Sequence, residues 1–266
     1  MSSSPSCLSL VGGSSELHAD VWHAHTLATP IAQVVATGDT GLDAQLPGGG
    51  WPVGALTELL QTPGNHSEWR LLAPALARFG TAAVVLVAPP HVPFGPALAA
   101  RGVASKRLMW VQSAAATQRL WATEQALRCA GVDAVLAWLP QARADQLRRL
   151  QMAASEYNRL LFVMRPSAAR QESSPAVLRL VLEPEGGYRF SAGLHVDHLR
   201  VHILKRRGPP LEQAVQVPAC EPALAVLLAA LQRPWPIAAS QLASEMASTV
   251  APLLQETGYA LDRAAA

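Results

Sequence analysis

The chain has 266 residues, of which 50% are hydrophobic and 15% are charged, and its formal net charge is +2. This length and composition suffice for one sizeable hydrophobic core with appended segments, and the small net charge gives no argument for a polyanionic partner. The three cysteines, Cys7, Cys129 and Cys220, are widely spaced and form no CxxC pair, so we expect a reduced, cytoplasmic protein without a zinc centre.

The two ends of the chain differ in character from the middle. Residues 1–20 start with a Ser- and Gly-rich stretch that has no basic segment, so we expect a disordered lead rather than a signal peptide. Residues 21–220 carry the strand and helix patterns of one core. Residues 221–266 are rich in Ala and Leu but interrupted by prolines, which predicts a helical, partly flexible, partner-binding appendage. Its longest apolar run is far shorter than the ~20 residues of a transmembrane helix.

Two Gly/Pro clusters come first in the core. Residues 37–43 (TGDTGLD) and 47–52 (PGGGWP) demand turns. Between these clusters, residues 42–46 are predicted to form one helical turn. A short apolar strand is predicted at residues 55–60, and a helix at residues 68–78.

The middle of the core alternates between strands and helices. Residues 82–88 are an uninterrupted apolar run with β-branched side chains, which is typical of a strand buried on both faces of a parallel sheet. A repeated βα pattern of this kind predicts a mainly parallel sheet flanked by helices. The further strands are predicted at residues 108–111, 132–139 and 160–164, and the helices at residues 96–104, 117–130 and 144–158.

The pattern changes after Arg165. A polar loop is predicted at residues 167–175, and the segments that follow partly alternate between apolar and polar residues. Such segments predict antiparallel strands added to the edge of the sheet. We expect these late strands at residues 178–183, 188–190, 199–204 and 214–217.

Several short motifs resemble the stretch that opens the ATPase core of RecA-type recombinases. Their order and spacing extend over residues 35–217. The resemblance implies an α/β fold with a RecA-like three-layer core. The motifs are Thr37-Gly38, Leu42-Asp43, Leu46, Gly48-Gly49-Gly50, Pro52, Gly54 and Glu58, followed by residues 101–103, 131–133 and 199–213.

The phosphate loop of that family is degenerate in this chain. In the family, a Gly-rich loop ending in Gly-Lys-Thr cradles phosphates with backbone N–H groups and a cation. Aligned with this chain, the loop falls on Gly64, His66, Ser67 and Glu68, and no Lys precedes Lys106. A glutamate at this place would repel phosphate. Gly64 is either a remnant that still holds an anion or a plain strand–helix turn.

The two carboxylates of the family's chemistry are also missing. The carboxylate that activates water falls at Pro89 and Pro90, and the Asp that supports magnesium falls at about Trp138. We therefore expect a core without catalytic residues, cofactor or metal, and not an enzyme.

Among RecA-like proteins without this chemistry, the chain most resembles the ImuA family. The resemblance rests on the Leu-Pro-Gly-Gly-Gly-Trp-Pro-x-Gly-Ala-Leu-Thr-Glu-Leu-Leu run of residues 46–60, on residues 71–76 and on Trp22. It implies an accessory role in SOS-induced, error-prone translesion DNA synthesis. The implied partners are an inactive Y-family polymerase homologue (ImuB), an error-prone C-family polymerase and RecA. The alternatives are a SulA-like division inhibitor and a divergent ATPase.

Two segments are candidate contact surfaces. An apolar helical stripe in the C-terminal appendage would dock into a partner groove, or pack against the chain's own sheet. A basic turn would contact DNA phosphates or an acidic partner, or remain a solvated turn. The stripe consists of Leu224, Leu227, Leu228 and Leu231, and the basic turn of Lys205, Arg206 and Arg207.

Three further groups of residues have a functional and a structural interpretation. Glu58 is either a surviving functional acid or a structural residue, and the triple glycine at residues 48–50 is either a phosphate nest or a permissive turn. A histidine-rich segment has metal-binding residue types but no third set of ligands nearby in the sequence, so an exposed edge strand explains it as well. This segment contains His195, Asp197, His198 and His202.

Overall fold

A computed structural model describes residues 33–185, 198–211 and 213–218 of the chain. The chain divides into two compact units, one formed by Met1–Glu183 with Val201–Val215, the other by Pro184–Arg200 with Gln216–Ala266. The predicted N-terminal lead and C-terminal appendage lie outside the described residues, and so do Leu224, Leu227, Leu228 and Leu231.

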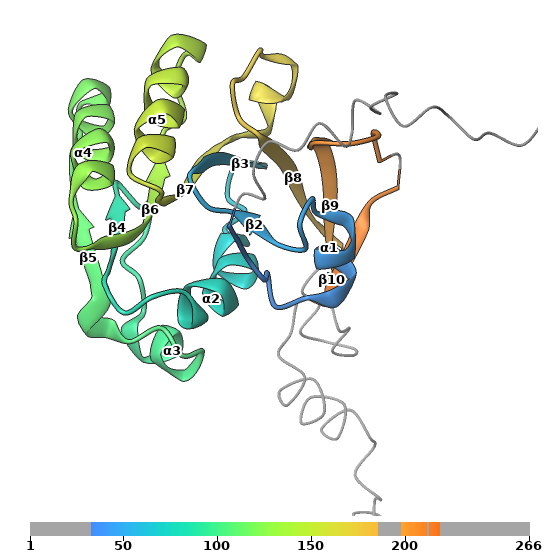
Figure 1. Cartoon of the computed structure of the whole chain (residues 1–266), viewed down its shortest axis with the longest axis horizontal. Coiled ribbons are helices and arrows are strands. Elements are labelled where there is room, and N and C mark those ends of the chain that lie inside the picture. Colours follow the sequence, from blue (N-terminus) through green and yellow to red (C-terminus); the bar gives the residue numbers. More distant parts are fainter. Residues whose placement is uncertain (1–32, 186–197, 212, 219–266) are drawn as a thin grey trace, which may run out of the picture. The chain divides into compact units, whose positions relative to one another are not determined.

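The main sheet has eight strands in the order β10-β9-β8-β3-β7-β6-β4-β5 (Figure 1). From β8 to β5, every neighbouring pair is parallel. The mainly parallel sheet expected from the buried apolar runs is therefore confirmed. Its strands are β3 (Ala55–Gln61), β4 (Ala83–Val87), β5 (Leu108–Val111), β6 (Val132–Trp138), β7 (Leu160–Pro166), β8 (Leu178–Glu185), β9 (His198–Lys205) and β10 (Val215–Pro218).

Helices cover both faces of the parallel strands (Figure 1). On one face lie α2 (Glu68–Arg78) and the short α3 (Gly95–Ala100), and on the other lie α4 (Ala116–Arg128) and α5 (Ala144–Glu156) side by side. This arrangement confirms the RecA-like three-layer α/β fold. No helix within the described ranges is long and apolar enough to cross a membrane.

An extensive apolar cluster lies between the sheet and the α4–α5 layer. Alternate residues of a strand point to the same face, so Leu161 and Val163 of β7 face this layer. Burial of such side chains contributes about 25 cal/mol per Å² of apolar surface. The helices meet the strands through the buried side chains of Ala126, Leu127, Leu147, Leu150, Ala153 and Ala154.

One strand departs from the prediction. β8 was expected to be antiparallel and to extend the sheet at its edge. It instead pairs with β3 in parallel register, with Arg179 beside Glu58. A parallel neighbour requires a crossover connection, and the loop predicted at residues 167–175 supplies it. This loop contains a 3-10 helix, η2 (Ser167–Gln171), whose Ala169 packs against Leu60 and Val181.

A small ribbon precedes the main sheet. β1 (Val34–Val35) pairs antiparallel with β2 (Trp51–Pro52), and β2 lies in the cluster of residues 47–52 that was predicted as a turn. Gly50 makes this pairing possible, because a Cβ atom there would lie 2.3 Å from the Val35 carbonyl oxygen. Two aspartates of this region hold the chain locally: Asp39 caps α1 (Thr40–Gln45), and Asp43 accepts a hydrogen bond from the Thr37 N–H.

A buried arginine, Arg107, connects the C-terminal end of α2 to the amino ends of β4 and β6. Arg107, within the 3-10 helix η1 (Ser105–Arg107), donates hydrogen bonds to the carbonyl oxygens of Ala82, Leu76 and Phe79 at 2.8–2.9 Å. It also pairs with Asp133 at 3.2 Å. The end of α2 and the starts of β4 and β6 are thereby fixed to one side chain. The helix predicted at residues 96–104 is shorter, because α3 ends at a turn formed by Arg101 and Gly102, whose φ is +86°.

Candidate functional site

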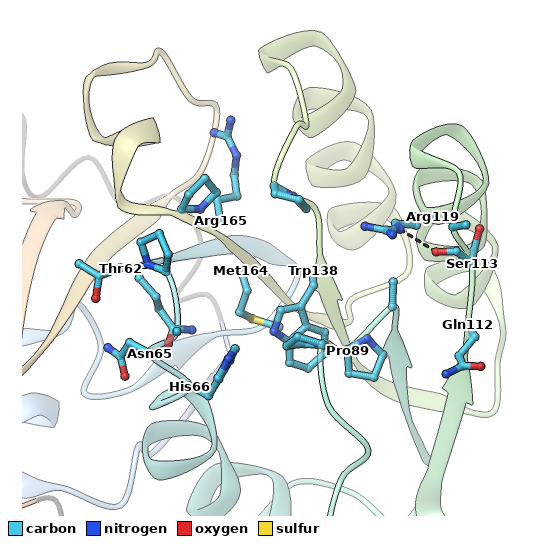
Figure 2. A pocket seen from close by; sticks show the side chains of 18 residues that line it. Thr62, Asn65, His66, Pro89, Gln112, Ser113, Arg119, Trp138, Met164 and Arg165 are labelled. Atoms are coloured by element: carbon cyan, nitrogen blue, oxygen red, sulfur yellow. Dashed lines mark hydrogen bonds between the residues drawn. The ribbon is translucent and has the colours of Figure 1, made fainter. Parts of the chain in front are cut away.

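A cavity of about 770 Å³ opens at the carboxyl ends of the parallel strands (Figure 2). This edge is where open α/β sheets bind their ligands. The loops after β3, β4, β5, β6 and β7 all contribute to its lining. In Figure 2, His66, Pro89, Trp138 and Met164 gather in its middle, and Arg119 points in from α4. The three positions at which the sequence lacks the recombinase chemistry therefore meet in one cavity.

The loop at the phosphate-loop position has a turn and then a helix start. Gly64 has a φ of +80°, a conformation that favours glycine. Asn65 closes the turn by donating its N–H to the Thr62 carbonyl oxygen at 3.0 Å, and α2 begins four residues after Gly64, at Glu68. The strand–turn–helix frame of a phosphate loop is thus present.

Glu68 places a carboxylate in the first turn of α2, the helix whose start would face an anion in this frame. Its side chain is 2% exposed and accepts a hydrogen bond from the Gln61 amide at 3.0 Å. The side-chain oxygen of the same residue, Gln61 Oε1, accepts the Ser67 N–H at 3.1 Å. A carboxylate in the first turn is favoured by the helix dipole. The positive end of α2 is therefore already matched by a charge of the chain itself.

The other two family positions are occupied by apolar residues. Pro89 and Pro90 follow Ala88, whose φ of +51° is unusual for a residue other than glycine. Its N–H donates to the Val111 carbonyl oxygen at 2.8 Å, which holds the bend at the end of β4. Trp138, at the end of β6, is 9% exposed and lines the cavity.

The charges at the cavity are cationic. Its lining, as far as the chain is described, includes Arg119 and Arg165 and contains no Asp, Glu or Lys. Arg119 donates its Nε–H to the Ser113 carbonyl oxygen at 2.8 Å, and its terminal nitrogens have no partner within the described ranges. The Arg165 side chain points away from the middle of the cavity (Figure 2).

Arg165 instead belongs to a buried ion cluster with Glu58. Glu58 is fully buried and accepts Arg165 Nη1 at 3.1 Å and Arg179 Nε at 2.5 Å. The same two arginines hold the crossover loop, Arg165 through the Glu172 carboxylate at 2.6 Å and Arg179 through the Ala169 carbonyl oxygen at 2.9 Å. Glu58 thus lies between two arginines, inside the sheet, rather than among the residues that line the cavity. This geometry fits the structural interpretation.

The basic turn lies away from this cavity. Arg206 donates to the carbonyl oxygens of Gln45 and Pro209, and Lys205 donates to the Ser174 carbonyl oxygen at 3.0 Å. Arg207 is exposed and has no hydrogen-bonding partner in the described part of the chain. Arg206 and Arg207 line a second cavity of about 620 Å³ together with Gly48.

The histidine-rich segment is described in part. His195 and Asp197 lie outside the described residues. His202 Nε2 is 3.3 Å from Glu183 on β8, which is a cross-strand contact. Across the described ranges, no group of three His, Cys, Asp or Glu side chains is arranged to hold a metal ion.

Part of the lining of the cavity at the strand ends was not predicted from the sequence. Gln112, Ser113 and Arg119 come from the end of β5 and the start of α4. Their signal in the sequence is only positional, since they follow a predicted parallel strand at its carboxyl end.

The comparisons with known proteins give one partial relative. No protein-family model matches the chain. Over 115 residues the chain is 30% identical to the cell division inhibitor SulA of Edwardsiella piscicida, a match that covers 43% of this chain and 60% of SulA. The chain thus spans less than two thirds of that relative's length. The similarity supports a SulA-like relationship over this part of the chain.

Proposed function

We propose that the chain is a non-catalytic protein that acts through contacts with other proteins. The observation that carries this proposal is the buried Glu68 carboxylate at the start of α2, where a recombinase would hold phosphate. The cavity at the strand ends has prolines and Trp138 where that chemistry needs carboxylates. A RecA-like fold that lacks these catalytic groups can still offer its surface for binding to other proteins.

Calorimetry with ATP and magnesium tests the non-catalytic part of this proposal. The intact chain should release no binding heat at nucleotide concentrations up to about 1 mM. An affinity in the micromolar range, near −8 kcal/mol, would contradict the loss of nucleotide binding and favour the divergent ATPase.

Within this class, the proposed role is that of an accessory scaffold in SOS-induced, error-prone translesion DNA synthesis. The motifs shared with the ImuA family support it. The partners would be the ImuB-type inactive Y-family polymerase homologue, an error-prone C-family polymerase and RecA, all in the cytoplasm. The proposed contact surface is the apolar stripe of Leu224, Leu227, Leu228 and Leu231, with the basic turn as a second contact.

A pull-down with the cognate ImuB-type protein tests this role. The full chain should retain the partner, and the quadruple change of the four stripe leucines to Asp should release it. The matched control places four Asp residues at Ala225, Ala229, Ala230 and Ala238, in the same segment. Equal retention by both variants would show that the stripe is not the contact surface, and no retention by the unchanged chain would refute the scaffold role.

The second candidate is a SulA-like inhibitor of cell division, favoured by the 30% identity to SulA. Its target would be the tubulin-like division protein. Overproduction of the chain should then produce filamentous cells, and suppressor changes in the division protein should restore division. Filamentation that persists in such suppressor strains would argue against this candidate.

A further inference from the structure

The cavity at the strand ends continues as a groove between α4 and α5. A space of about 400 Å³ adjoins it, and Ala114, Arg119 and Pro140 line both. A further space of about 240 Å³ follows, and it shares Thr117 and Leu120 with the preceding one. The three spaces thus form a continuous path from the loop at Gly64 to the outer surface of α4.

Apolar side chains line this path at intervals. Trp138 and Met164 line the first space, Leu120 and Leu139 the second, and Trp121 the third. Trp121 is 65% exposed, although an aromatic side chain of this size contributes most when it is buried. The arrangement suits a ligand that places apolar side chains at more than one point along its length.

The side chains that line the path carry mainly positive charge. Its described lining contains four arginines and one acid, Glu124, which is already bound by Arg128 at 2.7 Å and Arg149 at 2.6 Å. Among the described residues, the terminal nitrogens of Arg119 have no partner. In the same part of the chain, Arg143 has only an exposed side-chain contact with Asp145 at 3.4 Å, a kind of pair that contributes little. The path therefore offers two available cations without available acids.

The helix ends reinforce this charge. α4 begins at Ala116 without a side-chain hydrogen bond to its first turn, and α5 begins at Ala144, directly after Arg143. Residues of both first turns line the second space. The positive ends of two helix dipoles thus lie beside Arg119 and Arg143, which favours carboxylates.

From this geometry we infer that the path is a docking groove for an extended, acidic segment of a partner protein. Apolar side chains of that segment occupy the space at Trp138 and Met164 and the surface at Trp121. Its carboxylates pair with Arg119 and Arg143. The inference rests on the proposed protein-interaction function and gives that function a surface within the described core.

A peptide fits these observations better than a nucleic acid strand. A strand of nucleic acid needs a series of cations along its phosphates, whereas Arg149 is bound to Glu124 and Arg165 to Glu58. Two separated cations between apolar sites match a few acidic residues interspersed with apolar ones.

Selection from a random 12-residue peptide display library on the intact chain tests the inference. Enriched peptides should combine Asp or Glu with Leu, Phe or Trp. The best peptide, labelled with fluorescein, should bind in a polarisation assay, and its affinity should fall at least about tenfold in the Arg119→Glu/Arg143→Glu variant. The Arg101→Glu/Arg148→Glu variant makes the same change of charge at exposed residues outside the path, and it should bind as the unchanged chain does.

Three results would overturn the inference. The first is a selection that returns no peptides, or peptides without an excess of Asp and Glu, and the second is equal binding of the peptide by the two double variants. The third is displacement of the labelled peptide by a 12-residue oligothymidylate at a lower concentration than that of the unlabelled peptide. The last result would assign the groove to nucleic acid. Since the pull-down with the ImuB-type protein is independent of this selection, retention there together with failure here would refute the groove alone.

Discussion

Glu58 and Arg179, 121 residues apart in the chain, form an ion pair of 2.5 Å inside the sheet. They are direct neighbours in the parallel register of β3 and β8. Arg165, two residues beyond Val163, completes the pairing from β7 on the other side of β3. One buried carboxylate therefore links the three strands at the middle of the sheet.

Replacing Glu58 should destabilise the chain strongly. Glu58→Gln leaves the buried Arg179 without its carboxylate and leaves Arg165 with the Glu172 carboxylate in place of two. The loss of one partner of a buried ion pair costs about 3–5 kcal/mol. Urea unfolding followed by circular dichroism measures the effect. Asp145→Asn is the matched control, because its pair with Arg143 is more than 70% exposed and should contribute at most about 0.5 kcal/mol. A loss below about 1 kcal/mol for Glu58→Gln would contradict the structural role.

Arg107 should be equally sensitive. Arg107→Met keeps an unbranched apolar stem but leaves three carbonyl oxygens without their donor and removes the ion pair with Asp133, which still accepts the Ala82 N–H. Each buried polar group that loses its partner costs about 1–3 kcal/mol, so we expect a total of at least about 3 kcal/mol in urea unfolding. Lys106→Met changes the exposed neighbour and should stay within about 0.5 kcal/mol. Similar losses in both variants would show that the cluster is not needed.

Gly50 should not tolerate a side chain. In Gly50→Ala the new Cβ atom would lie 2.3 Å from the Val35 carbonyl oxygen, so the β1–β2 ribbon has to open. We expect a loss of about 2 kcal/mol or more and a lower melting temperature, since overpacking of this kind costs about 1–3 kcal/mol. Gly131→Ala, where a Cβ atom meets nothing within 4 Å, serves as the control and should change stability little. Equal melting temperatures for the two variants would contradict the close approach.

Within the basic turn, Arg206 should contribute to stability and Arg207 should not. Arg206→Ala removes hydrogen bonds to two backbone carbonyl groups and should cost about 1 kcal/mol in urea unfolding. Arg207→Ala removes an exposed side chain and should cost less than about 0.5 kcal/mol. If the turn contacts DNA, Arg207→Ala should still weaken a mobility shift at low salt. A larger unfolding effect for Arg207 than for Arg206 would reverse this assignment.

Local patterns predicted most of the parallel core. The helix α2 and the strands β3 to β7 follow from apolar runs and turn residues that lie within each segment. The parallel pairing of β8 with β3 could not be predicted from local patterns. The alternation of apolar and polar residues from Leu178 to Leu182 is compatible with a parallel or an antiparallel strand. What decides it is the pairing of Arg179 with Glu58 and the crossover held by Arg165, and these are contacts between distant segments.

The candidate site was predicted in its position and not in its chemistry. The motif alignment indicated that Gly64, Pro89 and Trp138 occupy related places, and the structure brings all three to one cavity. The hydrogen bond between Glu68 and Gln61 and the wall formed by Arg119 depend on side-chain geometry, which residue spacing does not convey. The strand β2, formed by Trp51 and Pro52, could not be predicted for another reason. A two-residue strand within a Gly/Pro cluster is too short to show a periodic pattern.

The position of β3 in the sheet has a consequence for the synthesis of the chain. β3 leaves the ribosome early, yet its two neighbours, β7 and β8, begin about a hundred residues later, at Leu160 and Leu178. Until then both edges of an apolar strand lack their partners, a state that invites association with other chains. Pairing over such sequence separations is also slow. The nascent protein is therefore expected to depend on chaperones, and a chain that stops before β8 is expected to aggregate rather than fold.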